Sequence, residues 1–74
     1  MKKARKTPDS KVLASILVLA RKGQTRERLA EAASLPDTQF RRHMAALVDG
    51  GLIRYDLSKK LWVTTDRGYR YLKS

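Results

Sequence analysis

Four polar side chains that lie close together in the sequence could bind the base edges and phosphates of a nucleic acid. They are Thr38, Gln39, Arg41 and Arg42. An arginine can donate two hydrogen bonds to the O6 and N7 atoms of guanine, and a glutamine can pair with adenine in a similar way. A threonine can contact a thymine methyl group or a phosphate. The alternative is that these side chains only form the solvated face of a helix.

The sequence around these four residues has the period of an amphipathic helix over residues 37–49. Apolar residues separated by four and then three positions share one face of such a helix. These residues are Phe40, Met44 and Leu47. At about 100° per residue, Thr38 and Arg42 point the opposite way and Gln39 and Arg41 flank them. We expect Asp37 or Ser34 to cap this helix and Gly50-Gly51 to end it.

Two further helices are predicted before this one. The spacing of apolar residues predicts a first helix from about Asp9 to Lys22, and Gly23 is expected to end it. A second helix is expected from about Arg26 to Ala33, with Thr25 as its N-cap. We expect Leu35 to point inward in the turn that follows.

The C-terminal third changes to the alternating pattern of β-strands. We predict two strands, at residues 53–55 and 61–64, joined by a loop at residues 56–60. A final helix is predicted at residues 66–73. Tyr69 and Leu72 are the expected core residues of the final helix, and Gly68 is expected to allow close packing against the strands. The order of elements predicts an α+β, mostly α fold with a three-helix core, a two-stranded hairpin and a short C-terminal helix.

Charge and composition limit the possible functions. Seventeen Lys and Arg against seven Asp and Glu give a net charge of +10, which attracts polyanions such as nucleic acid. There is no cysteine, so disulfides, thiolate–metal sites and cysteine nucleophiles are excluded. The acids are scattered and no glycine-rich phosphate loop is present, so we expect neither an enzyme nor a cofactor or metal site.

The length of 74 residues suits one small domain. We divide the chain into a basic N-terminal arm, residues 1–8, and a folded domain, residues 9–74. The arm is expected to be a solvated tail or to follow a DNA backbone. No apolar run is long enough to span a bilayer, and Lys11 interrupts the only stretch that resembles a secretory signal. A cytoplasmic location beside DNA is therefore expected.

The order helix, helix, helix, hairpin, helix resembles the winged helix-turn-helix superfamily over residues 9–73. One group of residues that carries the resemblance is Thr25-x-x-x-Leu29-Ala30, Leu35 and Phe40-x-x-x-Met44-x-x-Leu47-x-x-x-Gly51-Leu52-Ile53. The other is the ending Val63-Thr64-Thr65-Asp66-Arg67-Gly68-Tyr69-x-x-Leu72. This ending is similar to that of the MarR, ArsR and PadR regulators and of small archaeal winged-helix proteins.

The resemblance implies a transcriptional regulator that binds double-stranded DNA. Residues 37–49 would be the recognition helix in the major groove, and residues 54–61 would be the wing on the backbone or in the minor groove. The start of the second helix would lie against the DNA backbone. The residues implied in DNA contact are Thr25, Arg26, Thr38, Gln39, Arg41, Arg42, Arg54, Lys59 and Lys60.

Several alternatives stay open. Related regulators usually dimerise through long terminal helices, and no such helix is evident before Ser74, so a homodimer is possible but not indicated. The chain could also be a sequence-independent architectural DNA binder, which its charge favours, or a winged-helix adaptor that binds proteins. A single-strand or RNA binder would need an exposed Trp62, whereas packing of this side chain is expected. His43 is expected to be a partly buried packing residue.

Overall fold

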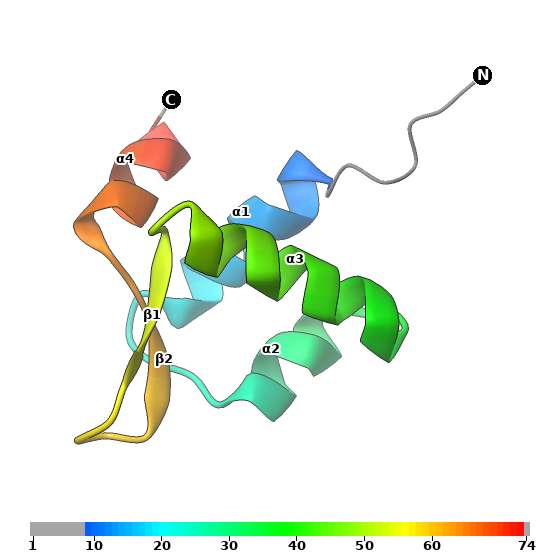
Figure 1. The fold of residues 1–74 in the computed structure, drawn as a ribbon, viewed down its shortest axis with the longest axis horizontal. Coiled ribbons are helices and arrows are strands. Elements are labelled where there is room, and N and C mark those ends of the chain that lie inside the picture. The colour runs from blue at the N-terminus through cyan, green and yellow to red at the C-terminus, as the bar shows by residue number, and fades with distance from the viewer. Residues whose placement is uncertain (1–8, 74) are drawn as a thin grey trace.

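A computed structural model describes residues 9–73 of the chain. Its elements are α1 (Ser10–Ala20), α2 (Arg26–Ala33), α3 (Asp37–Asp49), β1 (Ile53–Asp56), β2 (Leu61–Thr64) and α4 (Asp66–Lys73) (Figure 1). The predicted α+β, mostly helical architecture is confirmed, as is the order of its elements. The expected basic arm, residues 1–8, lies outside the described residues. Within residues 9–73, no helix is both long and apolar enough to cross a membrane.

The first helix is capped by Asp9, whose carboxylate accepts a hydrogen bond from the N–H of Lys11 at 2.8 Å. It ends at Ala20, so the expectation that it continues to Lys22 is wrong. The chain turns after Ala20 because the N–H of Gly23 donates to the carbonyl of Ala20 at 3.0 Å. Gly23 has a φ of 91°, a conformation that glycine adopts without the steric cost of a Cβ atom.

The turn between α2 and α3 is short and tightly bonded. Thr25 caps α2 as expected, and its hydroxyl accepts from the N–H of Arg28 at 3.2 Å. Ser34 ends α2 in the left-handed conformation, with a φ of 53°. The N-cap of α3 is Pro36, and no side chain caps this helix. The expected cap by Asp37 or Ser34 is therefore wrong, because Ser34 closes α2 and Asp37 is already helical.

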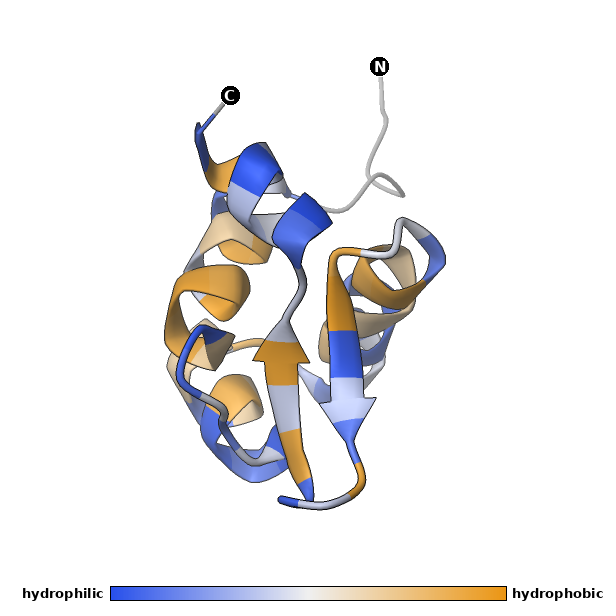
Figure 2. Ribbon diagram, turned by 90° about the vertical axis from the view of Figure 1, so that its left-hand side faces the viewer, coloured by the Kyte–Doolittle hydropathy of each residue, from blue (hydrophilic) through white to orange (hydrophobic). Residues whose placement is uncertain are grey.

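One hydrophobic core lies between the first three helices and the hairpin. Its buried residues are Ile16, Leu17, Ala20, Leu29, Phe40, Met44, Leu47 and Ile53. They include the complete apolar stripe predicted for α3. Leu35 is partly buried against this cluster, as expected. In Figure 2 the two strands face the viewer and the hydrophobic stretches of the helices lie beside and behind them.

The two strands pair in an antiparallel register that places Ile53 opposite Thr64 and Asp56 opposite Leu61. Because Asp56 extends β1, the connecting turn is residues 57–60, one residue shorter than predicted. The buried hydroxyl of Thr64 donates to the backbone carbonyl of Leu17 at 2.6 Å. This hydrogen bond joins the end of the hairpin to the last turn of α1.

A backbone bridge joins the α1–α2 connection to β2. The N–H of Gln24 donates to the carbonyl of Trp62 at 3.0 Å, and the N–H of Trp62 donates to the carbonyl of Gln24 at 2.8 Å. Trp62 is partly buried against the core and its ring meets that of Tyr55 edge to face, with the centroids 5.2 Å apart. The expected packing of Trp62 is confirmed.

The last helix packs against the hairpin through Gly68. A Cβ atom at this position would clash with the backbone oxygen of Leu52 and the methyl group of Thr64, so the expected close approach is confirmed. Tyr69, expected in the core, is 38% exposed, and this prediction is wrong. Tyr71 and Leu72 pack against the core instead.

Candidate nucleic-acid interface

The polar face of α3 is exposed, whereas the opposite face is fixed in the core. Thr38, Gln39, Arg41 and Arg42 are all exposed. Three of them, Thr38, Arg41 and Arg42, line one shallow hollow together with Ala45. Gln39 lies about 100° around the helix from Thr38, so it belongs to a neighbouring face. The structure therefore brings three of the four side chains together.

The acidic side chain of Asp37 lies between two of the expected cationic residues. Its carboxylate is 3.9 Å from the guanidinium of Arg26 and 3.8 Å from that of Arg41. The side chains of all three residues are between 47% and 69% exposed, so each pair contributes only about 0–1 kcal/mol to stability. The i, i+4 spacing of Asp37 and Arg41 is a sequence signal for this contact that the prediction of the site did not use.

Arg26, the first residue of α2, reaches across to α3. The guanidinium of Arg26 lies 5.2 Å from the centroid of the buried Phe40 ring. Thr25 is exposed, and its hydroxyl uses its acceptor function to cap α2. The O–H of Thr25 can therefore still donate a hydrogen bond outward. The start of α2 thus offers one donor, Thr25, and one cation, Arg26, and the latter reaches Asp37 of α3.

The turn of the hairpin is held by Asp56. One carboxylate oxygen accepts from the hydroxyl of Ser58 at 2.6 Å, from its N–H at 3.0 Å and from the N–H of Lys59 at 3.3 Å. These hydrogen bonds hold the pKa of Asp56 below its ordinary value, and the bond from the Ser58 hydroxyl has the largest effect. The N–H of Lys60 donates to the backbone oxygen of Asp56 at 2.7 Å. The exposed Lys59 and Lys60 thus project from a well-ordered turn.

Arg54 lies apart from the hollow on α3. It is exposed on β1 and lines a second shallow hollow with residues at the start of α4, including Asp66 and Arg67. Arg67 is also exposed and was not singled out from the sequence. The structure therefore groups Arg54 with the start of α4 and does not bring it to Thr38, Arg41 and Arg42.

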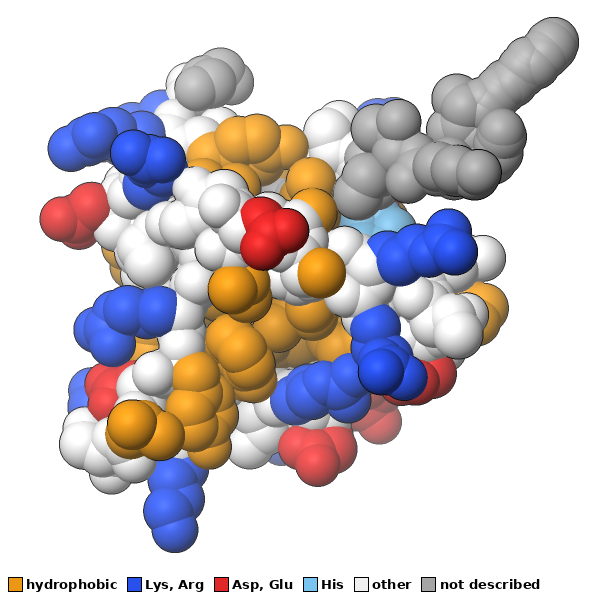
Figure 3. Space-filling view, viewed as in Figure 1, with side chains coloured by type: hydrophobic (Ala, Val, Ile, Leu, Met, Phe, Trp, Pro, Cys, Tyr) orange, Lys and Arg blue, Asp and Glu red, His pale blue; other side chains and the backbone are white. Residues whose placement is uncertain are grey.

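The face that carries α3 and the hairpin combines cations with apolar side chains. Figure 3 shows hydrophobic atoms in the middle of this face and Lys and Arg side chains around them. The exposed apolar residues include Val48 of α3, at 47%, and Tyr55 of β1, at 42%. Both could contact apolar groups of a partner, such as thymine methyl groups or the side chains of a protein.

His43 is buried on α3, more deeply than predicted, at 8% exposure. Its Nδ1 lies 2.7 Å from the carbonyl oxygen of Gln39, and its Nε2 accepts from the backbone N–H of Asp9 at 3.0 Å. The carbonyl can only accept, so we assign the proton of the neutral ring to Nδ1. The sequence prediction missed this contact, which joins the start of α1 to α3.

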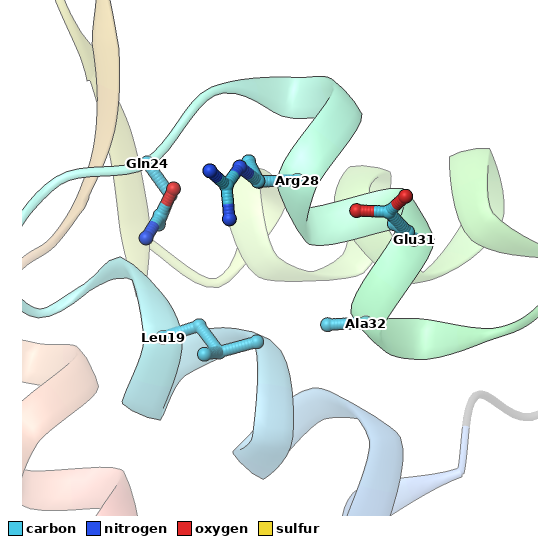
Figure 4. A pocket seen from close by; sticks show the side chains of 5 residues that line it. All are labelled: Leu19, Gln24, Arg28, Glu31 and Ala32. Atoms are coloured by element: carbon cyan, nitrogen blue, oxygen red, sulfur yellow. The ribbon is translucent and has the colours of Figure 1, made fainter.

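Another hollow lies between α1 and α2 and shares no lining residue with the one on α3 (Figure 4). It is lined by Leu19, Gln24, Arg28, Glu31 and Ala32. Within residues 9–73, no group of three or more His, Asp or Glu side chains is placed to hold a metal ion.

Comparisons with known proteins do not indicate a function for this chain. No protein-family model matches the chain, and a search of curated proteins finds no similar sequence. The exposed polar face of α3, with Arg26 at the start of α2 beside it, is the most developed candidate for a binding surface.

Proposed function

We propose that this protein is a winged helix-turn-helix protein that binds double-stranded DNA and regulates transcription. The observation that carries the proposal is the shared hollow of Thr38, Arg41 and Arg42 on a helix whose other face is fully buried. The major groove of B-DNA is about 12 Å wide and admits one α-helix. In this proposal α3 enters the major groove and the hairpin lies on the adjacent backbone or minor groove.

The arrangement of the elements supports the winged-helix assignment. Three helices surround one core, and the hairpin follows α3 after three residues, which is the order of elements in a winged helix (Figure 1). The bridge between Gln24 and Trp62 ties the hairpin to the connection before α2. The hairpin is thus fixed to the helical part of the domain at β2 as well as at its beginning.

The chemistry of the α3 face supports direct reading of bases. Within residues 9–73, the guanidinium of Arg42 has no ion pair, so its donors are available for guanine. Arg41 can exchange its exposed contact with Asp37 for a base or phosphate at small cost. Ala45 offers an apolar surface in the same hollow, suitable for a thymine methyl group.

The basic groups around α3 supply the affinity that does not depend on sequence. Lys59 and Lys60 on the hairpin turn and Arg26 on α2 are exposed and suited to phosphates. Each neutralised phosphate of a duplex contributes about −0.9 to the slope of log K against log salt concentration. The net charge of +10 also steers the protein towards the duplex before the specific contacts form.

The direct test is selection of the full chain on random duplexes, followed by affinity measurements on the selected and a scrambled duplex at two salt concentrations. We expect one enriched motif and a selected duplex that binds at least about 10³-fold more tightly than the scrambled one. Equal affinity for every sequence would show an architectural binder instead. A two-fold symmetric motif would indicate that a homodimer binds.

A second candidate function is that of an adaptor that binds another protein. The exposed Val48 and Tyr55 favour it, because exposed apolar and aromatic side chains can contact another protein. An adaptor should not bind duplexes detectably in the assay above. It should also keep its partner when Arg41 and Arg42 are both replaced by Ala.

A further inference from the structure

We propose that Leu57, in the turn of the hairpin, inserts between two neighbouring base pairs from the minor groove and bends the duplex. This inference rests on the proposed function and adds to it an apolar contact that deforms the DNA. It starts from the position of one apolar side chain. Leu57 is 80% exposed, the highest value among the exposed large hydrophobic residues of residues 9–73.

The turn holds Leu57 in one place. One oxygen of the Asp56 carboxylate accepts from the hydroxyl and the N–H of Ser58, at 2.6 and 3.0 Å, and from the N–H of Lys59 at 3.3 Å. The N–H of Lys60 donates to the backbone oxygen of Asp56 at 2.7 Å and closes the turn. The backbone on both sides of Leu57 is therefore fixed, and the negative charge of Asp56 is directed into the turn.

The strands behind this turn are fixed to the helices. The hydroxyl of Thr64 donates to the carbonyl of Leu17 at 2.6 Å, and Gln24 and Trp62 exchange two backbone hydrogen bonds. Figures 1 and 2 both show the turn at the free end of the hairpin, projecting beyond the helices. A side chain that separates stacked bases needs such a support, because a loosely held hairpin would move aside instead of bending the duplex.

The groups beside Leu57 match the chemistry of a minor groove. Lys59 and Lys60 are exposed in the same turn and suit the phosphates on either side of the groove. Proteins that bind the minor groove often insert an apolar wedge, such as leucine, and the unstacked base step then kinks by about 20–90°. Lysine is depleted in interfaces between proteins, so the two lysines favour nucleic acid over a protein as the partner of Leu57.

Insertion of Leu57 predicts which duplexes bind best. Pyrimidine–purine steps, such as TA and CA/TG, are kinked and unstacked most easily. We therefore expect one of these steps in the selected motif, beside the sequence that α3 contacts. Leu57 would give specificity at this step through the cost of deforming it, without a hydrogen bond to either base.

The test measures the bend of the selected duplex at saturating protein, by energy transfer between dyes at its two ends. Leu57→Ser removes the apolar wedge, whereas Leu57→Met keeps one. We expect wild type and Leu57→Met to bend the duplex and Leu57→Ser to leave it nearly straight. The affinity of Leu57→Ser should fall about 3- to 30-fold, since the burial of a leucine is partly offset by the unstacking of the step.

Two controls separate the wedge from general effects on binding. Leu57 is mostly exposed, so both of its variants should keep the melting temperature of the wild type. Lys59→Ala removes a neighbouring charge and keeps the wedge. It should lower the affinity but leave the bend of the saturated duplex unchanged.

A second measurement follows the base step itself. 2-Aminopurine placed at the pyrimidine–purine step should become more fluorescent when wild-type protein binds, and much less so with Leu57→Ser. Replacement of the step by AA, which is typical of stiff A-tracts, should weaken binding of the wild type. The same replacement should have little effect on Leu57→Ser, because that variant does not deform the step.

Two results would overturn the inference. One is a duplex that Leu57→Ser bends as much as the wild type does. The other is a duplex that stays straight although the wild-type protein binds it with a clear sequence preference. In both cases the proposed function stands and only the wedge fails. If the wild type binds no duplex but binds vesicles of anionic phospholipid through Leu57, the turn is a membrane contact and both proposals fail.

Discussion

The guanidinium of Arg26 lies over the ring of Phe40, 5.2 Å from its centroid. Phe40 is completely buried, whereas Arg26 is about half exposed, so a scaffold residue of α3 holds a cation of α2 at the surface. Such a contact contributes about 0.5–1 kcal/mol at an exposed site. It holds the cation at the start of α2 against α3, where its guanidinium also lies 3.9 Å from the Asp37 carboxylate.

A first prediction concerns the acid between the two arginines. Asp37→Asn removes a negative charge that repels phosphates and frees Arg26 and Arg41 from their shared carboxylate. We expect duplex affinity to rise about 2- to 10-fold and the free energy of unfolding to change by less than about 1 kcal/mol. Fluorescence anisotropy and urea unfolding measure the two effects. Glu31→Gln, the same charge change in the hollow between α1 and α2, should raise affinity less. Weaker binding by Asp37→Asn would mean that its carboxylate is needed to orient the arginines.

A second prediction separates the shape of the hairpin turn from its charge. Lys60 has a φ of 58°, a conformation that Asn tolerates better than most residues. Lys60→Asn should therefore preserve the turn, and Lys59→Ala removes the neighbouring charge. Together they should weaken binding to all duplexes alike and reduce the magnitude of the salt slope by about 2. A loss confined to the selected duplex would show that the turn reads sequence and does not simply contact phosphates.

A third prediction concerns the pH dependence of the hairpin turn. The hydrogen bonds from Ser58 and Lys59 lower the pKa of Asp56 in the folded protein. The ionised carboxylate therefore stabilises the turn above its ordinary pKa, and this contribution is lost as the pH falls through the lowered value. An NMR titration of the Asp56 carboxyl group should show the shift downwards. Ser58→Ala removes the hydroxyl whose hydrogen bond lowers the pKa of Asp56 most, so the pKa should move back towards its ordinary value. An unchanged pKa would contradict the role given to this hydrogen bond.

A fourth prediction concerns Gly68. Helix propensity alone favours Gly68→Ala by up to about 1 kcal/mol. The added Cβ would clash with the oxygen of Leu52 and the methyl group of Thr64, so we expect a net destabilisation of about 1–3 kcal/mol. Arg67→Ala, at an exposed position in the same helix, should change stability little. A more stable Gly68→Ala would mean that α4 does not pack closely on the hairpin.

The bounds of α2, α3 and α4 could be predicted because their signals are local. Thr25 caps α2, and the stripe of Phe40, Met44 and Leu47 orients α3. Tyr69 was placed wrongly because its helix turns Gly68, Tyr71 and Leu72 inward, at i, i+3 and i+4. Gly68 and Leu72 were predicted correctly, and Tyr71 was missed because the prediction assigned the aromatic contact to Tyr69.

The contacts that relate the elements of the site could not be predicted, because they join residues far apart in the sequence. Neither the bridge from Gln24 to Trp62 nor the hydrogen bond from Asp9 to His43 has a local signal. The separation of Arg54 from the hollow on α3 likewise depends on a non-local contact, because Arg54 shares its hollow with Asp66 and Arg67 at the start of α4. The exposed residues on α3 could be predicted from the helical period. Which residues of other elements lie next to them could not.

Binding of DNA by α3 is tested most directly by the duplex affinity of the double variant Arg41→Ala with Arg42→Ala. Its control is Lys22→Ala with Lys73→Ala, which removes the same charge at exposed positions outside the proposed interface. We expect the first variant to lose at least about 100-fold in affinity for the selected duplex and most of its preference over a scrambled one, with an unchanged melting temperature. The control should lose only a few-fold, equally on both duplexes. Equal losses for the two variants would contradict the placement of α3 in the major groove.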